Sequence, residues 1–533
     1  MQETILNSWQ EETWPTIKSS QPLPMGEGVI DATAFNTIEI DKVFEAVNHA
    51  STNVGQAVLY RSLCQPLSDL KAIKAKQDAL LELQKNQKLK EQLEQLVASA
   101  AINEKNLHLL LFGEFLGAFS QARAKNEIEG YGYKQYKSGV SFIQDFVSSI
   151  QAAEKPKGKY LTELFNKVKV FSESRYYSLM QGPVYFVEGK ITSKEERGES
   201  YFPVPVIFKP QIFKPMLLGS IFALLWLISL FSPVSIAPSL RTVAVFLGPL
   251  LLLYFPIVGG YDRDNCIIPL RNEYKKAEPV AELLDALGQI DELLSFMKFA
   301  DNFPHSTVLP KFEDVKHHRI NLTSAVNPVL GKENPNYVGN DFELDDEKLV
   351  LLTGPNSGGK TAFCKTVTQI QVLAQIGGYI PAKTASLTVA DKVFYQVPEI
   401  SHLDDGEGRF GTELKRTKDI FLASSAKSLV VLDELSEGTT FEEKMEASSN
   451  VLNGFYRKGN STILITHNHQ LVDQFAKAGT GNAKQVEFAN DAPTYRLIPG
   501  ISRVSHADRV AKKIGFSKED IDSYFDSQPD TSK

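Results

Sequence analysis

The chain has 533 residues and a formal net charge of −7, from 57 Lys and Arg against 64 Asp and Glu. Its 43% hydrophobic and 23% charged residues exclude a disordered, collagen-like or fibrous chain, and at roughly 150 residues per domain its length predicts about three structural units. Three widely spaced cysteines (Cys64, Cys266 and Cys364) exclude a disulfide framework, and the acidic balance argues against a surface that attracts nucleic acid everywhere.

The first part of the chain predicts a helical domain. Residues 1–30 show no regular pattern and are interpreted as a lead-in, with an acidic, polar start that does not resemble a secretory signal peptide. From 31 to about 153 apolar residues recur at intervals of three and four, most clearly in 69–97, which is typical of helices, and the signal is mixed from 155 to 209. We expect a helical core and lever domain at 31–200. A short β-rich patch at 183–192 is the exception.

Residues 201–265 contain an apolar stretch that predicts a membrane hairpin. The runs 216–232 and 242–260 carry no charged residue, and each approaches the roughly 20 residues needed to cross a hydrocarbon core. Lysine and arginine flank both outer ends, which favours a hairpin whose ends face the cytoplasm. We therefore expect the chain to lie at the cytoplasmic face of the inner (plasma) membrane, with its remaining parts in the cytosol. The alternative is a buried core hairpin of a soluble domain.

After the hairpin the pattern changes twice. Residues 266–320 return to a helical pattern and end in a loop-rich linker. From 321 to 533 short β-branched runs alternate with helical stretches, which is the signature of a parallel α/β sheet followed by a helical tail.

A phosphate-binding loop opens this last segment. Residues 354–361 match G-x-x-x-x-G-K-[ST] at every position, after a predicted strand and before a predicted helix. Glycines let backbone N–H groups surround phosphates, Lys360 is expected to reach the β- and γ-phosphates, and the Thr361 hydroxyl is expected to bind Mg²⁺. The predicted ATP-binding residues of the loop are Gly354, Pro355, Asn356, Ser357, Gly358, Gly359, Lys360 and Thr361.

Two later strands end in residues that would complete a hydrolytic site. Asp433 is placed to hold Mg²⁺, and Glu434, one residue on, to polarise an attacking water. His467 ends a third strand and is expected to sense the γ-phosphate. Solvated strand ends and a structural histidine are the alternatives, which the order of the three motifs disfavours. We therefore predict an ATPase with Lys360, Glu434 and His467 as catalytic residues.

This order of motifs resembles that of the ABC superfamily of ATPases. The residues within the motifs resemble those of the MutS family of DNA mismatch repair ATPases. Residues 353–361 (TGPNSGGKT) are similar to the TGPNxGGK[ST] loop of the MutS family, and 433–440 (DELSEGTT) to its DExxxGT[ST] stretch. Residues 376–382 and 495–515 are similar to its IGxxVPA and C-terminal patterns. Residues 52–79 more weakly resemble its helical core.

The resemblance implies a fold, cofactors and partners. The fold would be an α/β P-loop ATPase domain of the ABC/MutS type at 321–533, plus an all-α core and lever domain at 31–200 with a transmembrane hairpin insertion. ATP and Mg²⁺ would be the cofactors. The chain would form a homodimer, and that homodimer would bind mismatched or distorted DNA. The adenine would lie near Tyr337 and Val338, where the family has an aromatic-aliphatic pair.

The chain also departs from the family pattern. Only about thirty residues precede the helical core, so we expect a divergent, membrane-associated member that lacks the mismatch-recognition domain. In the family's trans-acting Ser-Thr-Phe segment, Gly408 and Arg409 replace the Ser-Thr pair and Phe410 is retained. Because glycine offers no hydroxyl to a partner's γ-phosphate, we hypothesise that Arg409 supplies a charge there, as an arginine finger does.

Three functions remain open from the sequence. In the first, a membrane-tethered MutS-like ATPase drives lever or clamp movement on mismatched or distorted DNA. In the second, a membrane-anchored ATP-dependent switch acts on a protein partner without DNA, which the net acidity favours. An ABC-type transporter is the weakest, because no LSGGQ signature precedes Asp433 and one hairpin is too small for a translocation path.

Overall fold

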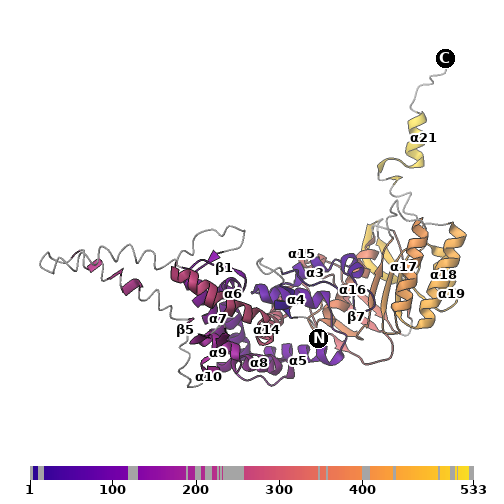
Figure 1. Ribbon diagram of the computed structural model, residues 1–533. Helices are drawn as coiled ribbons and strands as arrows, with labels where there is room; N and C mark the ends of the chain where they lie inside the picture. Colours follow the sequence, from indigo (N-terminus) through magenta and orange to yellow (C-terminus); the bar gives the residue numbers. More distant parts are fainter. Residues whose placement is uncertain are drawn as a thin grey trace, which may run out of the picture. The chain divides into compact units, whose positions relative to one another are not determined.

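The structure is a computed structural model of the chain (Figure 1). It describes residues 4–9, 17–117, 130–187, 190–197, 206–210, 257–345, 348–355, 358–398, 408–435, 440–489, 492–503, 511–512 and 514–526, with a few isolated positions between 219 and 231. The chain divides into two compact units. Unit 1 comprises Met1–Ser20, His49–Arg61 and Asp78–Ser295, and unit 2 comprises Gln21–Asn48, Ser62–Gln77 and Phe296–Lys533.

Unit 1 is mainly helical. Its helices, wholly or in part, are α1 (Ile5–Ser8), α4 (Asn53–Cys64), α5 (Leu70–Lys85), α6 (Gln87–Phe112), α7 (Tyr133–Ala152), α8 (Lys159–Ser172), α9 (Arg175–Gln181), α10 (Lys194–Arg197), the π-helical turn η1 (Arg263–Ile267), α13 (Ile268–Lys276) and α14 (Glu278–Asn302). The Asn86 side chain caps α6 by accepting a hydrogen bond from Leu89 N at 3.2 Å. Helices α6 and α7 approach closely at Gly139, where a Cβ would lie 2.7 Å from the Asn106 carbonyl oxygen.

Two buried carboxylates of α14 have hydrogen-bond partners in or beside α4. Arg61 donates to both carboxylate oxygens of Asp285, at 3.1 and 2.8 Å. Asp291 accepts from Thr52 N and Thr52 Oγ1, both at 2.7 Å, directly before α4 begins. Since a buried charge without a partner is strongly destabilising, these pairs hold α4 and α14 together where they meet inside unit 1.

The expectation of an all-α domain is wrong for part of unit 1. Strands β3 (Val184–Val187), β4 (Lys190–Thr192) and β5 (Val206–Phe208) form a sheet in the order β4-β3-β5, and β1 (Glu114–Phe115) pairs with β2 (Gly130–Tyr131). The first sheet forms because aromatic and β-branched residues pair across strands, as Phe186 does with Ile191.

The predicted membrane hairpin is not described by the structure. Most of the runs 216–232 and 242–260 lies outside the described residues. Within the described part of the chain, no helix is both long enough and apolar enough to cross a membrane.

Unit 2 is built on a six-stranded sheet in the order β11-β12-β13-β9-β14-β15. Every neighbouring pair is parallel except β14 and β15. The strands are β9 (Leu349–Thr353), β11 (Val393–Gln396), β12 (Leu429–Asp433), β13 (Ser461–Ile465), β14 (Asn482–Ala489) and β15 (Ala492–Pro499). The central strands read as continuous apolar runs because helices cover both of their faces.

One face of this sheet is covered by three helices that run alongside one another (Figure 1). They are α17 (Gly408–Ala423), α18 (Phe441–Lys458) and α19 (His469–Lys477). A single apolar core joins their buried side chains to alternate strand residues, among them Leu349, Leu351, Val430, Leu432 and Leu464. The helix α16 (Lys360–Gln375) contacts β12 and β13 and is buried along most of its length.

A second sheet in unit 2 has the order β6-β10-β7-β8, with β6 (Lys311–Phe312), β7 (Ile320–Ala325), β8 (Asn340–Leu344) and β10 (Thr384–Leu387). The remaining helices of the unit are α2 (Ala32–Thr37), α3 (Ile40–Val47), α15 (Leu330–Glu333) and α21 (Lys518–Asp526). Helix α2 contacts β11, and its N-terminus is capped by Asp31, which accepts a hydrogen bond from Ala34 N at 2.7 Å.

A buried histidine lies between the second sheet and α16. His318 is 1% exposed, and its Nε2 donates to Gln371 Oε1 at 3.3 Å. Burial disfavours the charged imidazole and lowers the pKa of His318 from 6.5 to about 4. The folded chain therefore holds a neutral histidine at a pH where the unfolded chain protonates it.

This histidine predicts a loss of stability in acid. Between pH 6.5 and 4 the unfolded state binds the extra proton, so the free energy of unfolding falls as the pH falls through this window. Relative to pH 7, we expect His318 to remove about 2 kcal/mol at pH 5. Urea unfolding of the wild type and of His318→Gln at both pH values measures this. Equal pH dependence in the two proteins would contradict it.

Candidate functional site

The parallel sheet brings three predicted motifs to one edge. The carboxyl ends of β9, β12 and β13 face the same direction, because Leu352, Leu432 and Ile465 belong to adjacent parallel ladders. The loop that follows β9 therefore lies at the same sheet edge as Asp433 and Glu434, which end β12, and His467, which follows β13.

The loop after β9 adopts the conformation that its glycines allow. Gly354 has a φ of +136° and Gly359 a φ of +86°, both in a region that favours glycine, and α16 begins directly after Gly359 at Lys360. Asn356 and Ser357 lie outside the described residues.

Lys360 is folded into the loop. Its side chain is buried, with the residue 3% exposed, and Nζ donates to the carbonyl oxygens of Gly354 at 2.6 Å and Pro355 at 3.0 Å. Burial lowers the pKa of Lys360, while the nearby carboxylates of Asp433 and Glu434 act to raise it. The ammonium group of Lys360 is thus held against the backbone of the loop.

Thr361 and Asp433 meet across the sheet edge. Thr361 Oγ1 donates to Asp433 Oδ2 at 3.1 Å, although 72 residues separate them in the chain. A hydroxyl beside a carboxylate fits Mg²⁺, which prefers oxygen ligands and commonly takes only one or two from the protein, the others coming from water and phosphate. The described residues contain no cluster of three or more His, Cys, Asp or Glu side chains that could hold a metal ion.

Glu434 and His467 form a second polar pair. His467 Nε2 lies 3.2 Å from Glu434 Oε1, and Lys444 Nζ lies 4.0 Å from the other carboxylate oxygen. Glu434 has a φ of +57°, which is rare for a residue with a side chain, and its N–H donates to Ile465 O at 2.9 Å. Strained backbone of this kind is concentrated at functional sites.

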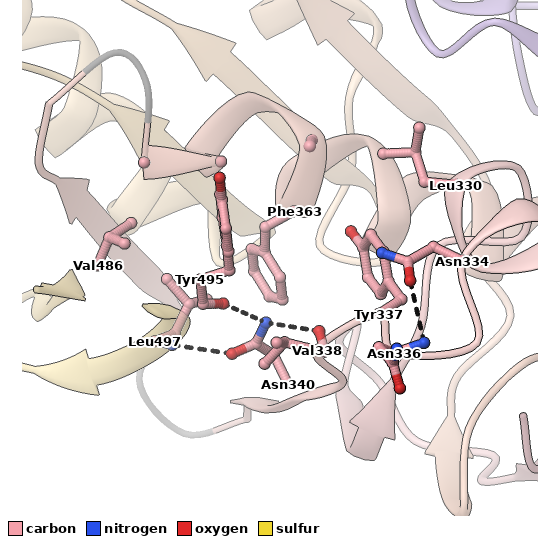
Figure 2. Close-up of a pocket in the computed structure, with 13 residues that line it drawn as sticks. Leu330, Asn334, Asn336, Tyr337, Val338, Asn340, Phe363, Val486, Tyr495 and Leu497 are labelled. Atoms are coloured by element: carbon pink, nitrogen blue, oxygen red, sulfur yellow. Dashed lines mark hydrogen bonds between the residues drawn. The ribbon is translucent and has the colours of Figure 1, made fainter. Parts of the chain in front are cut away.

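Beside the loop lies a pocket of about 350 Å³ (Figure 2). Tyr337 and Val338, the predicted adenine contacts, line it together with Gly358 and Gly359 of the loop. The full lining is Leu330, Asn334, Asn336, Tyr337, Val338, Asn340, Gly358, Gly359, Ala362, Phe363, Val486, Tyr495 and Leu497. The pocket therefore joins the predicted base contacts to the predicted phosphate loop.

Sequence reasoning missed several pocket residues. Tyr495 comes from β15 and lies against Gly359, where a Cβ would be 3.3 Å from its ring. Asn340 ties β8 to β15, because its Nδ2 donates to Tyr495 O at 2.9 Å and its Oδ1 accepts from Leu497 N at 2.8 Å (Figure 2). Both belong to strands without a chemical motif, so the sequence carried no local signal for them.

The predicted trans-acting segment lies at the start of α17. Gly408, Arg409 and Phe410 form its first residues, and Phe410 is half-buried. The side chain of Arg409 is outside the described part of the structure.

Comparison with known proteins assigns the chain to a family. Residues 350–524 match the family model of MutS domain V, and residues 32–180 match that of MutS domain III. The two models together cover more than half of the chain. The chain belongs to the MutS family.

Curated relatives agree with this assignment. The chain is 32% identical over 252 residues to the DNA mismatch repair protein MutS of Parabacteroides distasonis, a match that covers 45% of this chain and 28% of that protein. It is 31% identical over 256 residues to the DNA mismatch repair protein msh3 of Aspergillus niger, covering 44% of this chain and 22% of that protein. The matched region thus spans less than a third of the length of these relatives.

The relatives correct one expectation. The predicted location at the cytoplasmic face of the inner membrane, reached through residues 216–260, is wrong. The proteins that the chain matches are named DNA mismatch repair proteins. An apolar run shows only that its residues avoid water. Hydropathy alone does not distinguish a lipid bilayer from the interior of a protein.

Proposed function

We propose that the chain binds ATP with Mg²⁺ and hydrolyses it at the edge of the six-stranded sheet. The observation that carries this proposal is the 3.1 Å hydrogen bond between Thr361 and Asp433, which places the end of the phosphate-binding motif against the predicted metal-binding carboxylate. The pocket lined by Tyr337, Val338 and Tyr495 would take the adenine, because aromatic faces stack on a planar base.

Each polar group then has a role in the proposed reaction. The loop N–H groups and Lys360 bind the phosphates. Thr361 and Asp433 would hold Mg²⁺, which supplies positive charge to the phosphate oxygens. Glu434 would accept a proton from the attacking water, and His467, 3.2 Å from its carboxylate, would orient Glu434 and sense the γ-phosphate.

Two substitutions, one expected to abolish ATP binding and one expected to slow hydrolysis, test this division of roles. Lys360→Met should abolish ATP binding, because it removes the charge that faces the phosphates. Glu434→Gln should keep binding and lower kcat by about 100- to 10,000-fold, the usual contribution of a general base. Equilibrium binding of ATP and steady-state phosphate release measure the two effects.

Glu442→Gln provides the matched control, since Glu442 is an exposed residue in the first turn of α18. It should behave like the wild type in both assays. Full activity in Glu434→Gln would contradict the assignment of Glu434 as the base.

We further propose a homodimer in which the segment Gly408, Arg409 and Phe410 completes the partner's site. Support comes from the family membership and from the position of these residues at the N-terminal end of α17. Because this chain has glycine and arginine where the family has Ser-Thr, Arg409 would act as the charged group on the γ-phosphate.

Arg409→Ala tests this proposal. An arginine finger commonly contributes about a thousandfold or more to the rate, so we expect a loss of about that size in kcat with little change in ATP affinity. Lys418→Ala, which removes an exposed cation on the same helix, is the control. An unchanged ATPase rate in Arg409→Ala would show that Arg409 does not act on the γ-phosphate.

We propose that the ATPase acts on mismatched or distorted DNA. The support is that the relatives are named DNA mismatch repair proteins and that both matched family models are MutS domains. The alternative is an ATP-dependent switch that acts on a protein partner without DNA, which the net charge of −7 favours.

Salt dependence of DNA binding separates these two functions. A protein that contacts phosphates releases counterions, so the logarithm of its affinity falls linearly with the logarithm of the salt concentration. We expect such a slope for a mismatched duplex, weaker binding to the matched duplex, and an ATPase rate that changes with DNA. Fluorescence anisotropy over a KCl series measures the slope. No binding at low salt, with an unaltered ATPase rate, would favour the protein-partner switch.

A further inference from the structure

One wall of the pocket is a continuous segment, residues 327–340, which we call the wall segment. It contains α15 and supplies Leu330, Tyr337 and Val338 to the pocket. Ala362 and Phe363 of α16, the helix that begins at the end of the predicted phosphate-binding loop, also line the pocket. A ligand in the pocket would therefore contact both this segment and that helix.

The wall segment is fixed to α16 at its first residue. Asn327 is 3% exposed, and its Nδ2 donates to Thr366 Oγ1 and to Gln369 Oε1, both at 2.9 Å. Its Oδ1 accepts from Val329 N at 3.0 Å and from Leu330 N at 2.9 Å. Both donors and both acceptor sites of this buried amide are used, so the orientation of the segment start is determined.

Backbone hydrogen bonds carry this tie along the segment to Tyr337. Asn334 N donates to Leu330 O at 3.2 Å, and Tyr337 N donates to Asn334 O at 3.0 Å. Thr366 also donates to Ala362 O at 2.8 Å within its own helix. The start of the wall segment is thus anchored to a hydroxyl one turn beyond the part of α16 that lines the pocket.

We propose that Thr366 and Asn327 are positioning residues that hold the Tyr337 wall against α16 and thereby determine the affinity for the nucleoside part of the ligand. The inference rests on the proposed function, in which that pocket takes the base. The phosphate groups are bound separately, by Lys360 and Thr361, whose hydrogen bonds do not involve the wall segment. Loosening the wall should therefore weaken base binding alone, because the wall must then be ordered when the base binds.

A matched pair of isosteric changes on α16 tests this role. Thr366→Val removes the hydroxyl that accepts a hydrogen bond from Asn327 Nδ2. Thr368→Val makes the same change at a buried threonine of the same helix, whose hydroxyl donates only to Cys364 O and Lys365 O. Calorimetric titration of each full-length protein with ADP and with pyrophosphate, both with Mg²⁺, separates base binding from phosphate binding.

We expect Thr366→Val to raise the Kd for ADP about tenfold, equivalent to about 1.4 kcal/mol, and to leave the Kd for pyrophosphate and kcat at saturating ATP unchanged. Thr368→Val should change none of these values. Asn327→Asp keeps the acceptor for Val329 N and Leu330 N and removes the amide donors. It should also raise the Kd for ADP and leave the Kd for pyrophosphate unchanged.

Three outcomes would overturn the inference. Equal ADP affinity in Thr366→Val and Thr368→Val would show that the ties to the wall segment do not matter. Equal weakening of ADP and pyrophosphate would show a general disturbance of the site. A wild-type chain that binds neither ligand would overturn the proposed function and this inference with it, whereas the first two outcomes leave the proposed function standing.

Discussion

The parallel alignment of β9, β12 and β13 is the constraint on which the site depends. Parallel strands present their carboxyl ends at one edge, and ligands in such sheets bind outside that edge. Here the alignment brings Thr361 within hydrogen-bond distance of Asp433 and sets His467 beside Glu434. A strand reversed in direction would carry its polar residues to the opposite edge, and the constellation would not form.

The burial of α16 imposes a second constraint, since its polar side chains need partners inside the protein. Gln369 Nε2 donates to Ile38 O at 2.7 Å, and Gln375 Nε2 donates to Leu67 O at 2.8 Å. These bonds tie segments from the N-terminal part of the chain to the helix that follows the predicted phosphate-binding loop. They explain physically why residues 21–48 and 62–77 belong to unit 2 and not to the helical unit that surrounds them in sequence.

Predictions from the sequence were strongest where chemistry demands particular residues at short spacing. The glycines and Lys360 of residues 354–361 are adjacent in the chain, so local backbone requirements alone identified the loop and the start of α16. Hydropathy was a weaker guide. It led to a membrane location that the relatives contradict, because a run of apolar residues reports avoidance of water and not the medium that replaces it. The all-α description of the first domain failed at β3 and β4, which lie in the β-rich patch at 183–192 that the sequence itself indicated.

By itself, the sequence determined the motifs, the order of strands and helices along the chain, and the resemblance that family comparison confirmed. These are properties of neighbouring residues, which local geometry and periodicity express directly. Only the tertiary structure decided that Tyr495 lines the pocket, that Asn340 joins β8 to β15, and that Asn327 is hydrogen-bonded to Thr366. Such contacts join residues far apart in the chain, and a hydrogen bond between them exists only once packing has brought the strands and helices to within about 3 Å of each other.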